Sequence, residues 1–304
     1  VWTRHITALE DPSIADPALN GMDTTTRLQT VWQARTLPLP AGYPADQPID
    51  FGRLLPASGL RMKARANPQS GVTSGTMLPP GSGYRRMDNQ LYRVEIHDPP
   101  NGSAPATLKW SRENGSVAAA WVDQKGYDLI LSYPGRDESL DFSIGDWIEL
   151  IDDTRELLGQ RGVMVQVAHV EGHILTINPP KSGTISRADF PRRPKVRRWD
   201  MDAGPIAAPK NTWIAIEEGV EVWFEGDGCS VGDYWLIPAR AATRDIEWPQ
   251  SGNAPVARSP HGTRHRYVAL AALCSAGFGF YALVAFATGA FRLSDFRAGF
   301  SRTR

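Results

Sequence analysis

The sequence predicts a mainly β protein built from antiparallel barrel or sandwich modules with long Pro/Gly-rich loops. Gly and Pro contribute 28 and 24 of the 304 residues. Glycine costs helix entropy and proline removes a backbone donor, so we expect little helix. Short runs with period-two alternation recur between glycine-marked turns, which is the pattern of strands joined by hairpins. Strands at this close spacing favour a small barrel or a sandwich.

The composition narrows the classes of partner and cofactor. Lys and Arg together number 33, as do Asp and Glu, so the net charge of zero provides no steering toward nucleic acid or an anionic membrane. The two cysteines, Cys229 and Cys274, are too few for a disulfide framework or a four-cysteine zinc site. The sequence has no phosphate loop, dinucleotide fingerprint or Gly-x-Ser-x-Gly elbow. We therefore expect no cofactor.

The first region, residues 1–86, combines strands with long loops. Residues 1–6 resemble a strand and lack the charged and apolar parts of a signal peptide, so we expect a further upstream region. The compartment stays open between the cytoplasm and a released particle. Alternation over residues 25–35 predicts a strand. From Pro38 to about Arg86, Pro, Gly, Ser and Ala dominate, which predicts surface loops rather than packed elements.

The second region, residues 87–200, carries the densest strand signals and is expected to form a β barrel or sandwich. Turn pairs such as Asn114-Gly115 and Lys125-Gly126 supply the positive-φ residues that hairpins need. The strands are expected at residues 91–97, 106–112, 116–122, 127–132, 146–151, 163–168 and 173–177.

The third region, residues 201–266, is expected to form a second β module. Apolar alternation around Glu217-Glu218-Gly219 predicts a hairpin over residues 213–224, with an acidic outer face. The segment 231–236 repeats the pattern of 142–147, where a Gly-Asp pair precedes aromatic and apolar residues. We interpret the repeat as two similar turns that enter core strands.

The fourth region, residues 267–304, is an atypical apolar and then basic tail. Residues 267–291 form a run of 25 residues without a charge, which is long enough to span a bilayer. Glycine and alanine dilute the run, so burial as core strands is favoured over a transmembrane helix, and a membrane location is not expected. An altered reading frame is a further alternative. The tail also suggests a possible oligomer.

Four residues are the first candidates for acid/base chemistry. Alternation puts Glu95 and His97 on one face of a strand, with Asp98 at its end and Glu113 downstream. A carboxylate beside an imidazole can transfer protons near neutral pH. A polar strand face beside a turn produces the same residues. A wider group of acids, Asp137, Asp146, Glu149, Asp152 and Asp153 together with Glu113, offers pairs of the kind that glycoside hydrolysis uses.

Metal binding is expected to be absent, and the histidines are weak candidates for it. Odd spacing along a strand would put His169 and His173 on one side, with His261 and His265 as possible complements. Gly172 is expected to break that strand, and the helical two-histidine spacing of zinc proteases is missing.

Exposed aromatic and basic residues are the candidates for binding. Most of the ten tryptophans are expected in sheet cores, but Trp199 and Trp248 lie in polar, turn-rich contexts and are expected at the surface. Arg197 and Arg198 end a local basic run, which we interpret as an interface or a solvated strand rather than a nucleic-acid patch.

Four blocks of the sequence resemble a bacterial family of large proteins with a domain of unknown function, associated with gene clusters for phage-tail-like contractile injection systems. The blocks are residues 1–12, 89–97, 108–117 and 232–240. The resemblance covers most of residues 1–266, and the tail after Arg266 departs from it. It implies a structural or adhesive component of a baseplate or fibre, with no established active-site residues.

The candidate binding residues and the family resemblance together predict a structural or binding module. We expect this module to recognise either other subunits of an assembly or a glycan. The alternative is a hydrolase that acts on a glycan or an ester through the carboxylate and histidine candidates.

Overall fold

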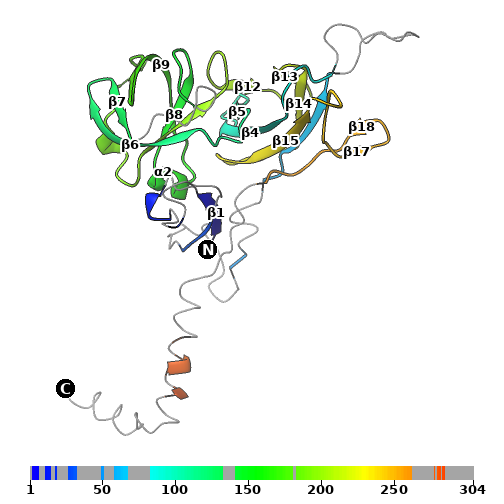
Figure 1. Cartoon of the computed structure of the whole chain (residues 1–304). Coiled ribbons are helices and arrows are strands. Elements are labelled where there is room, and N and C mark those ends of the chain that lie inside the picture. Colours follow the sequence, from blue (N-terminus) through cyan, green and yellow to red (C-terminus); the bar gives the residue numbers. More distant parts are fainter. Residues whose placement is uncertain are drawn as a thin grey trace, which may run out of the picture. The chain divides into compact units, whose positions relative to one another are not determined.

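The computed structural model confirms a mainly β protein (Figure 1). Two compact units are present, and all elements from β3 to β18 lie in the unit formed by Arg4–Gln29 and Ala57–Thr263. The structure describes residues 2–6, 11–14, 18, 27–32, 49–50, 58–67, 83–132, 141–180, 183–261, 277, 279–281, 283 and 284.

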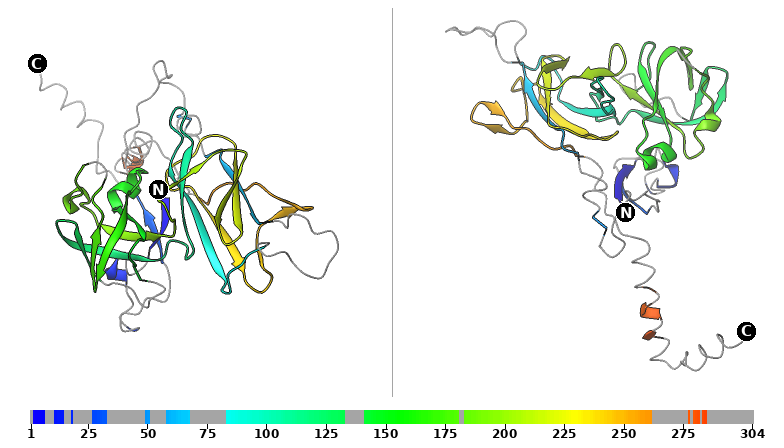
Figure 2. Two further views of the ribbon diagram at one scale, coloured as in Figure 1. Left: turned by 90° about the horizontal axis from the view of Figure 1, so that it is seen from above. Right: turned by 180° about the vertical axis from the view of Figure 1, so that it is seen from behind.

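Six antiparallel strands close into a barrel in the order β10-β7-β6-β11-β8-β9. The barrel is drawn mainly in green in Figures 1 and 2. Alternate residues of these strands, such as Ile148 and Leu150, fill the barrel interior and have no exposed surface. The period-two pattern therefore determines which side chains point inward. The strands are β6 (Ala118–Lys125), β7 (Asp128–Leu131), β8 (Trp147–Ile151), β9 (Val163–Glu171), β10 (Ile174–Ile177) and β11 (Lys195–Trp199).

The second module consists of two sheets around another apolar core. A five-stranded sheet has the order β12-β5-β4-β15-β16, and a three-stranded sheet has the order β13-β14-β3. The strands are β3 (Arg61–Ala66), β4 (Gln90–Asp98), β5 (Ala106–Ser111), β12 (Ile206–Ala208), β13 (Trp213–Glu217), β14 (Val220–Glu225), β15 (Tyr234–Arg240) and β16 (Asp245–Ile246). Strands β4 and β5 lie in the region 87–200, which the sequence analysis assigns to the first module. In the structure they pair with β15 and β12, which come from residues 201–266.

Strand β3 corrects the expectation of loops from Pro38 to about Arg86. It pairs with β14 along its whole length, and its Met62 and Ala64 are buried in the core of the second module. Met62 and Ala64 alternate with Arg61, Lys63 and Arg65. This alternation is the signal of a half-buried strand, and the surrounding Pro/Gly-rich sequence obscured it.

The predicted hairpin over residues 213–224 is confirmed as β13 and β14. Glu218 and Gly219 form its turn with φ angles of 44° and 87°. A Cβ at Gly219 would lie 2.0 Å from the carbonyl oxygen of Gly83. Glycine is therefore required here by the close approach of a second segment as well as by the turn.

The two Gly-Asp segments adopt the same turn, as the sequence pattern predicts. Asp146 Oδ2 accepts a hydrogen bond of 2.8 Å from the backbone N–H of Ser143, and Asp233 Oδ2 accepts one of 2.8 Å from Ser230. Each turn leads into a core strand, β8 and β15. Burial raises the pKa of both aspartates. Their role in the structure is to close turns.

Helix is scarce among the described residues, and the helix α2 (Asp153–Leu158) has clear end signals. Buried Asp152 caps its N-terminus by accepting a 3.0 Å hydrogen bond from the N–H of Arg155, and it also accepts one of 3.1 Å from Arg192. Gly159 ends the helix at a φ of 64°. The predicted acids Asp152 and Asp153 thus belong to a helix start.

The remaining elements are short. Ile6 and Asp11 near the start of the chain are buried, and Asp11 forms a 3.0 Å ion pair with Arg193. The remaining short elements of the described residues are the strands β1 (Trp2–Ile6), β2 (Arg27–Val31), β17 (Gln250–Ser251) and β18 (Ala254–Pro255) and the 3-10 turns Pro12–Ile14 and Arg187–Asp189.

The described part of the uncharged run 267–291 is helical, so the expectation of buried strands is wrong for these residues. Phe280 and Tyr281 are each 72% exposed. Alanine, which is frequent in the run, is the strongest helix former. Among the residues that the structure describes, no helix is long and apolar enough to cross a membrane.

Candidate functional site at the joint between the two modules

The outer wall of the barrel packs against one face of the five-stranded sheet. Strand β8 directs Ile148 and Leu150 into the barrel, so alternation turns Trp147 and Glu149 outward. Partly buried Trp147 packs against the core of the second module, and Trp199 of β11 is buried within that core. The two modules therefore share an interior boundary.

An ion-pair cluster, which we call the ionic joint, lies at this boundary and consists of Glu95, Lys109, Glu149 and Trp199. Lys109 Nζ lies 2.6 Å from each carboxylate oxygen of Glu149 and 3.1 Å from Glu95 Oε1. The side chains of the three charged residues are at most 7% exposed. Because β4 and β5 bring Glu95 and Lys109 while β8 brings Glu149, the cluster connects the sheet to the barrel.

The remaining lone pairs of Glu149 are also occupied. Its Oε2 accepts a 2.9 Å hydrogen bond from Trp199 Nε1, and its Oε1 accepts one of 3.1 Å from the N–H of Gly162. A Cβ at Gly162 would lie 2.3 Å from Glu149 Cγ, so only glycine leaves room for the carboxylate. Lys109 Nζ lies 4.5 Å from the centroid of the Trp199 ring, a cation–π contact. Such complete pairing is what a buried ion pair needs to offset its desolvation.

The electrostatics keep both carboxylates of the joint ionised. Burial by itself raises the pKa of Glu95, but Lys109 and then Arg93 outweigh it and hold that pKa at about 2. The pKa of Glu149 is also lowered. Burial and the charge of Glu95 each act to raise it, but the attraction of Lys109 for the ionised carboxylate is stronger than both. Neither group carries a proton to donate near neutral pH.

His97 is buried at a bulge in β4. Thr107 and Leu108 of β5 lie opposite Asp98 and Ile96, which leaves His97 as the extra residue. Its side chain is 5% exposed, and its Nδ1 has no hydrogen-bond partner within the described part of the chain. Burial, and then the charge of Lys109, lower the pKa of His97, so the imidazole is neutral at pH 7.

The other two catalytic candidates lie apart from the joint. Asp98 forms an ion pair with Arg161, which precedes β9, and so adds another link between sheet and barrel. Glu113 lies beside Leu91, at the opposite end of β4 from Asp98. The structure thus buries Glu95 and His97 near Lys109 and does not bring all four candidates into one site.

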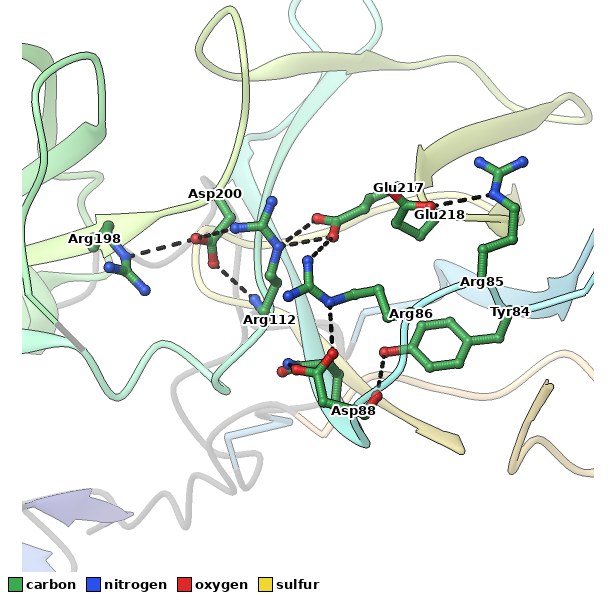
Figure 3. Close-up of polar contacts among 10 residues, drawn as sticks. Tyr84, Arg85, Arg86, Asp88, Arg112, Arg198, Asp200, Glu217 and Glu218 are labelled. Atoms are coloured by element: carbon green, nitrogen blue, oxygen red, sulfur yellow. Dashed lines mark hydrogen bonds and ion pairs between the residues drawn. The ribbon is translucent and has the colours of Figure 1, made fainter. Parts of the chain in front are cut away.

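A second polar network links Arg198 and Asp200 to Arg112, Glu217 and Arg86 (Figure 3). Asp200, at the end of β11, accepts hydrogen bonds of 2.8 Å and 3.0 Å from the backbone N–H and Nη1 of Arg112, and its Oδ1 lies 3.6 Å from Arg198 Nε. Arg112 Nε lies 2.6 Å from Glu217 Oε2, and Glu217 also pairs with Arg86 at 3.1 Å. This alternating row of charges connects the barrel strand β11 to the hairpin β13–β14.

The binding candidates occupy different places from those expected. Trp199 is 1% exposed, so the prediction that it lies at the surface is wrong. Its flanking arginines suggested exposure, but they lie in the boundary between modules, where Arg197 approaches Gly115 and Arg198 approaches Asp200. Trp248 is partly buried against the core of the second module, and its Nε1 donates a 2.9 Å hydrogen bond to Val256.

The histidine candidates for a metal are dispersed. His169 and His173 are exposed on the hairpin β9–β10, whereas His261 packs its ring 5.9 Å from that of Tyr234 in the second module. His265, like Asp137 of the acid group, lies outside the described residues. In the part of the chain that the structure describes, no group of three or more His, Cys, Asp or Glu side chains is arranged to hold a metal ion.

Sequence reasoning missed Lys109, and it named Glu149 only within a large group of acids. Lys109 lies between Leu108 and Trp110, so alternation assigns it to the polar face of β5. Nothing local indicates that a barrel covers that face. The available signal was that Lys109 is the one charged residue of β5.

The fold and the site define a class of protein: two antiparallel β modules joined through a buried, fully paired ionic cluster. The chain belongs to a family of unknown function, DUF6519, whose sequence model matches residues 1–73 and 60–282. The predicted membership of a family of unknown function is thereby confirmed. No curated protein and no solved structure matches the chain.

Proposed function

We propose that this protein is a structural or binding module of a phage-tail-like assembly, such as a baseplate or fibre, that recognises another subunit or a glycan without chemical turnover. The observation that carries the proposal is the ionic joint. Its acids are buried, ionised and paired across the boundary between two modules.

Hydrolysis of a glycan or an ester makes demands that the joint does not meet. A glycosidase needs one carboxylic acid that keeps its proton and a second carboxylate on the other side of the substrate. Glu95 and Glu149 instead share one ammonium group, Lys109, and their pKa values are lowered. The joint therefore supports the binding module over the hydrolase.

A stiff connection between modules suits a component that transmits load within an assembly. Buried ion pairs contribute little net stability compared with apolar packing, but they penalise any arrangement that leaves a charge unpaired. Glu95 and Lys109 on one module and Glu149 on the other thus favour a single docking geometry. The resemblance to proteins of contractile injection systems supports the same proposal.

The first test is a screen for hydrolysis of neutral polysaccharides, chitin oligomers and p-nitrophenyl esters by the purified chain. We expect no turnover from the wild type or from His97→Ala and Glu113→Gln. Turnover by the wild type contradicts the proposal, and its loss in either variant would locate the responsible site.

A second test concerns the assembly. Contractile particles isolated by sedimentation from the source bacterium should contain this protein in a fixed ratio to the sheath subunit, as measured by quantitative immunoblotting. Recovery of the protein only in the fractions without particles would reject the phage-tail assignment.

A further inference from the structure

The ionic joint holds one amine against two carboxyl groups in a place that is shielded from water. Lys109 Nζ lies 2.6 Å from both oxygens of Glu149 and 3.1 Å from Glu95 Oε1. The side chains of Lys109 and Glu149 are only 2% and 1% exposed. An amine and a carboxyl group that the fold already holds together can condense without the entropic cost of meeting.

Condensation of this pair would also remove buried charge. Two carboxylates and one ammonium group lie in the joint, and each of them loses hydration on burial. An amide between Lys109 and Glu149 would replace two of these charges by one neutral group that can still form hydrogen bonds. Burial penalises ions more than paired amides, so the interior favours the condensed form.

Glu149 has the surroundings of a carboxyl group that is attacked. Its Oε1 accepts a 3.1 Å hydrogen bond from the N–H of Gly162, and its Oε2 accepts one of 2.9 Å from Trp199 Nε1. Donors in these positions stabilise the negative charge that develops on a carboxyl oxygen during attack by a nucleophile. A Cβ at residue 162 would lie 2.8 Å from Glu149 Cδ, so only glycine lets the backbone come this close.

Glu95 has the position of a base. Its Oε2 accepts a 2.7 Å hydrogen bond from Arg93 Nε, and its Oε1 faces Lys109 Nζ at 3.1 Å. Glu95 and Lys109 are direct cross-strand partners in β4 and β5, so the sheet fixes this approach. A carboxylate at hydrogen-bond distance from an amine can take a proton from it during bond formation.

We propose that Lys109 and Glu149 condense to an isopeptide bond that links the second module covalently to the barrel, with Glu95 as the proton carrier. Lys109 Nζ first passes one proton to Glu149 Oε2, which turns the ion pair into an amine and a carboxylic acid. The lone pair of the amine then forms the Nζ–Cδ bond, and Glu95 takes a second proton from Nζ. The Cδ–Oε2 bond breaks, Glu95 gives its proton to the departing hydroxyl group, and one water molecule leaves.

The step is balanced within the joint. Glu95 ends as the carboxylate that it was at the start, no group is oxidised or reduced, and no co-reactant is consumed. The neutral amine and acid are needed once in the life of each molecule, so a resting state in which the ion pair dominates is sufficient. The link is a modification of the chain and not a turnover, and this inference goes beyond the proposed function without depending on it.

The test is mass spectrometry of the full chain, purified in the folded state and then denatured. We expect a mass below that of the sequence by one water molecule, and proteolytic mapping should find one branched peptide that contains Lys109 and Glu149. Lys109→Met should have its full sequence mass. Glu95→Gln removes the proton carrier and should lower the linked fraction about tenfold or more.

The pair Lys63–Glu225 provides a matched control within the same chain. Its Nζ–Oε2 distance is also 2.6 Å, but its side chains are 29% and 35% exposed. Water solvates these ions, so we expect no branched peptide that contains Lys63 and Glu225. Lys63→Met should form the link between Lys109 and Glu149 to the same extent as the wild type.

A wild-type mass equal to that of the sequence overturns the inference by itself, whatever the variants show. A loss of water that mapping assigns to other residues, or that persists in Lys109→Met, also overturns it. Equal linked fractions in Glu95→Gln and the wild type would reject the mechanism through Glu95. Circular dichroism establishes that each variant is folded before its mass is interpreted. Hydrolysis of a glycan, or absence of the protein from contractile particles, would reject the proposed function and leave the mass of the chain unchanged.

Discussion

At the scale of single residues, the decisive group is Lys109. Its ammonium pairs with two carboxylates from different modules, and removing it leaves both acids buried with less positive charge beside them. The pair Lys63–Glu225 is chemically similar but is about one-third exposed. The two lysines therefore differ mainly in how deeply their ion pairs are buried, and we expect their contributions to stability to differ for this reason.

We predict that Lys109→Met lowers the free energy of unfolding by about 3 kcal/mol, because it leaves uncompensated buried charge. Lys63→Met should lower it by less than about 1 kcal/mol, because water solvates the carboxylate that remains. Urea denaturation of both variants measures the difference. Equal losses would contradict the role assigned to the joint.

A second prediction at this scale concerns the pH dependence of stability. The pKa of folded His97 is lowered below its usual 6.5, so the unfolded chain binds a proton that the folded chain does not. The stability from the neutral imidazole is complete above about pH 6.5 and is lost as the pH falls below it. The wild-type free energy of unfolding should therefore fall between pH 7 and pH 5, and that of His97→Gln should fall less.

Glu95 acts in a separate and more acidic window. Its folded pKa of about 2 lies below that of an unfolded glutamate, so its contribution is present at pH 5 and is lost as the pH falls toward 2. Urea titrations at half-unit pH intervals distinguish the two windows. A decline in His97→Gln as steep as the wild-type decline between pH 7 and 5 would reject the assignment to the imidazole.

At the scale of elements, the hairpin β13–β14 depends on both its turn and its neighbour. Gly219 has a positive φ, and its Cα faces the carbonyl oxygen of Gly83 at a distance that excludes a Cβ. Gly172, in the turn of the hairpin β9–β10, also has a positive φ, of 57°, but nothing lies within 4 Å of the position of its Cβ. Substitution of Gly172 therefore measures the cost of the positive φ alone, whereas substitution of Gly219 adds the steric clash with Gly83.

We predict that Gly172→Ala costs about 1 kcal/mol of stability, since the left-handed conformation alone is penalised. Gly219→Ala should cost about 2 kcal/mol more than that, since the Gly83 segment must also move. Thermal unfolding followed by circular dichroism measures both variants. Similar melting temperatures for the two would show that contact with Gly83 does not constrain the hairpin.

At the scale of the whole molecule, the barrel and the second module are expected to unfold together. The ionic joint, the Asp98–Arg161 pair and the network around Asp200 all cross the boundary between them, beside the packed rings of Trp147 and Trp199. Opening one module alone would expose apolar surface and unpaired charges. The boundary therefore couples the two cores.

Native-state hydrogen exchange tests this coupling. The slowest amides of β8 and β11 should exchange with the same opening free energy as those of β4 and β5 in the wild type. In Lys109→Met the two sets should diverge, with one module opening before the other. Divergent values already in the wild type would show that the modules are energetically independent.

The sequence alone determined the fold class and most of the elements. Period-two alternation and glycine-marked turns are local signals, so they identified the hairpin at Glu218-Gly219 and the repeated turns at Asp146 and Asp233. They also placed Glu95 and His97 on one strand. Strand β3 shows the limit, because its alternation was short and lay within a Pro/Gly-rich region.

Only the tertiary structure decided what covers each strand face. Lys109 and Glu149 are separated by 40 positions in the sequence and are brought within 2.6 Å by the docking of the barrel on the sheet. Trp199 is buried for the same reason, although its polar neighbours suggested exposure. Alternation determines that successive side chains point in opposite directions, but burial depends on segments distant in the chain, and no local pattern encodes that contact.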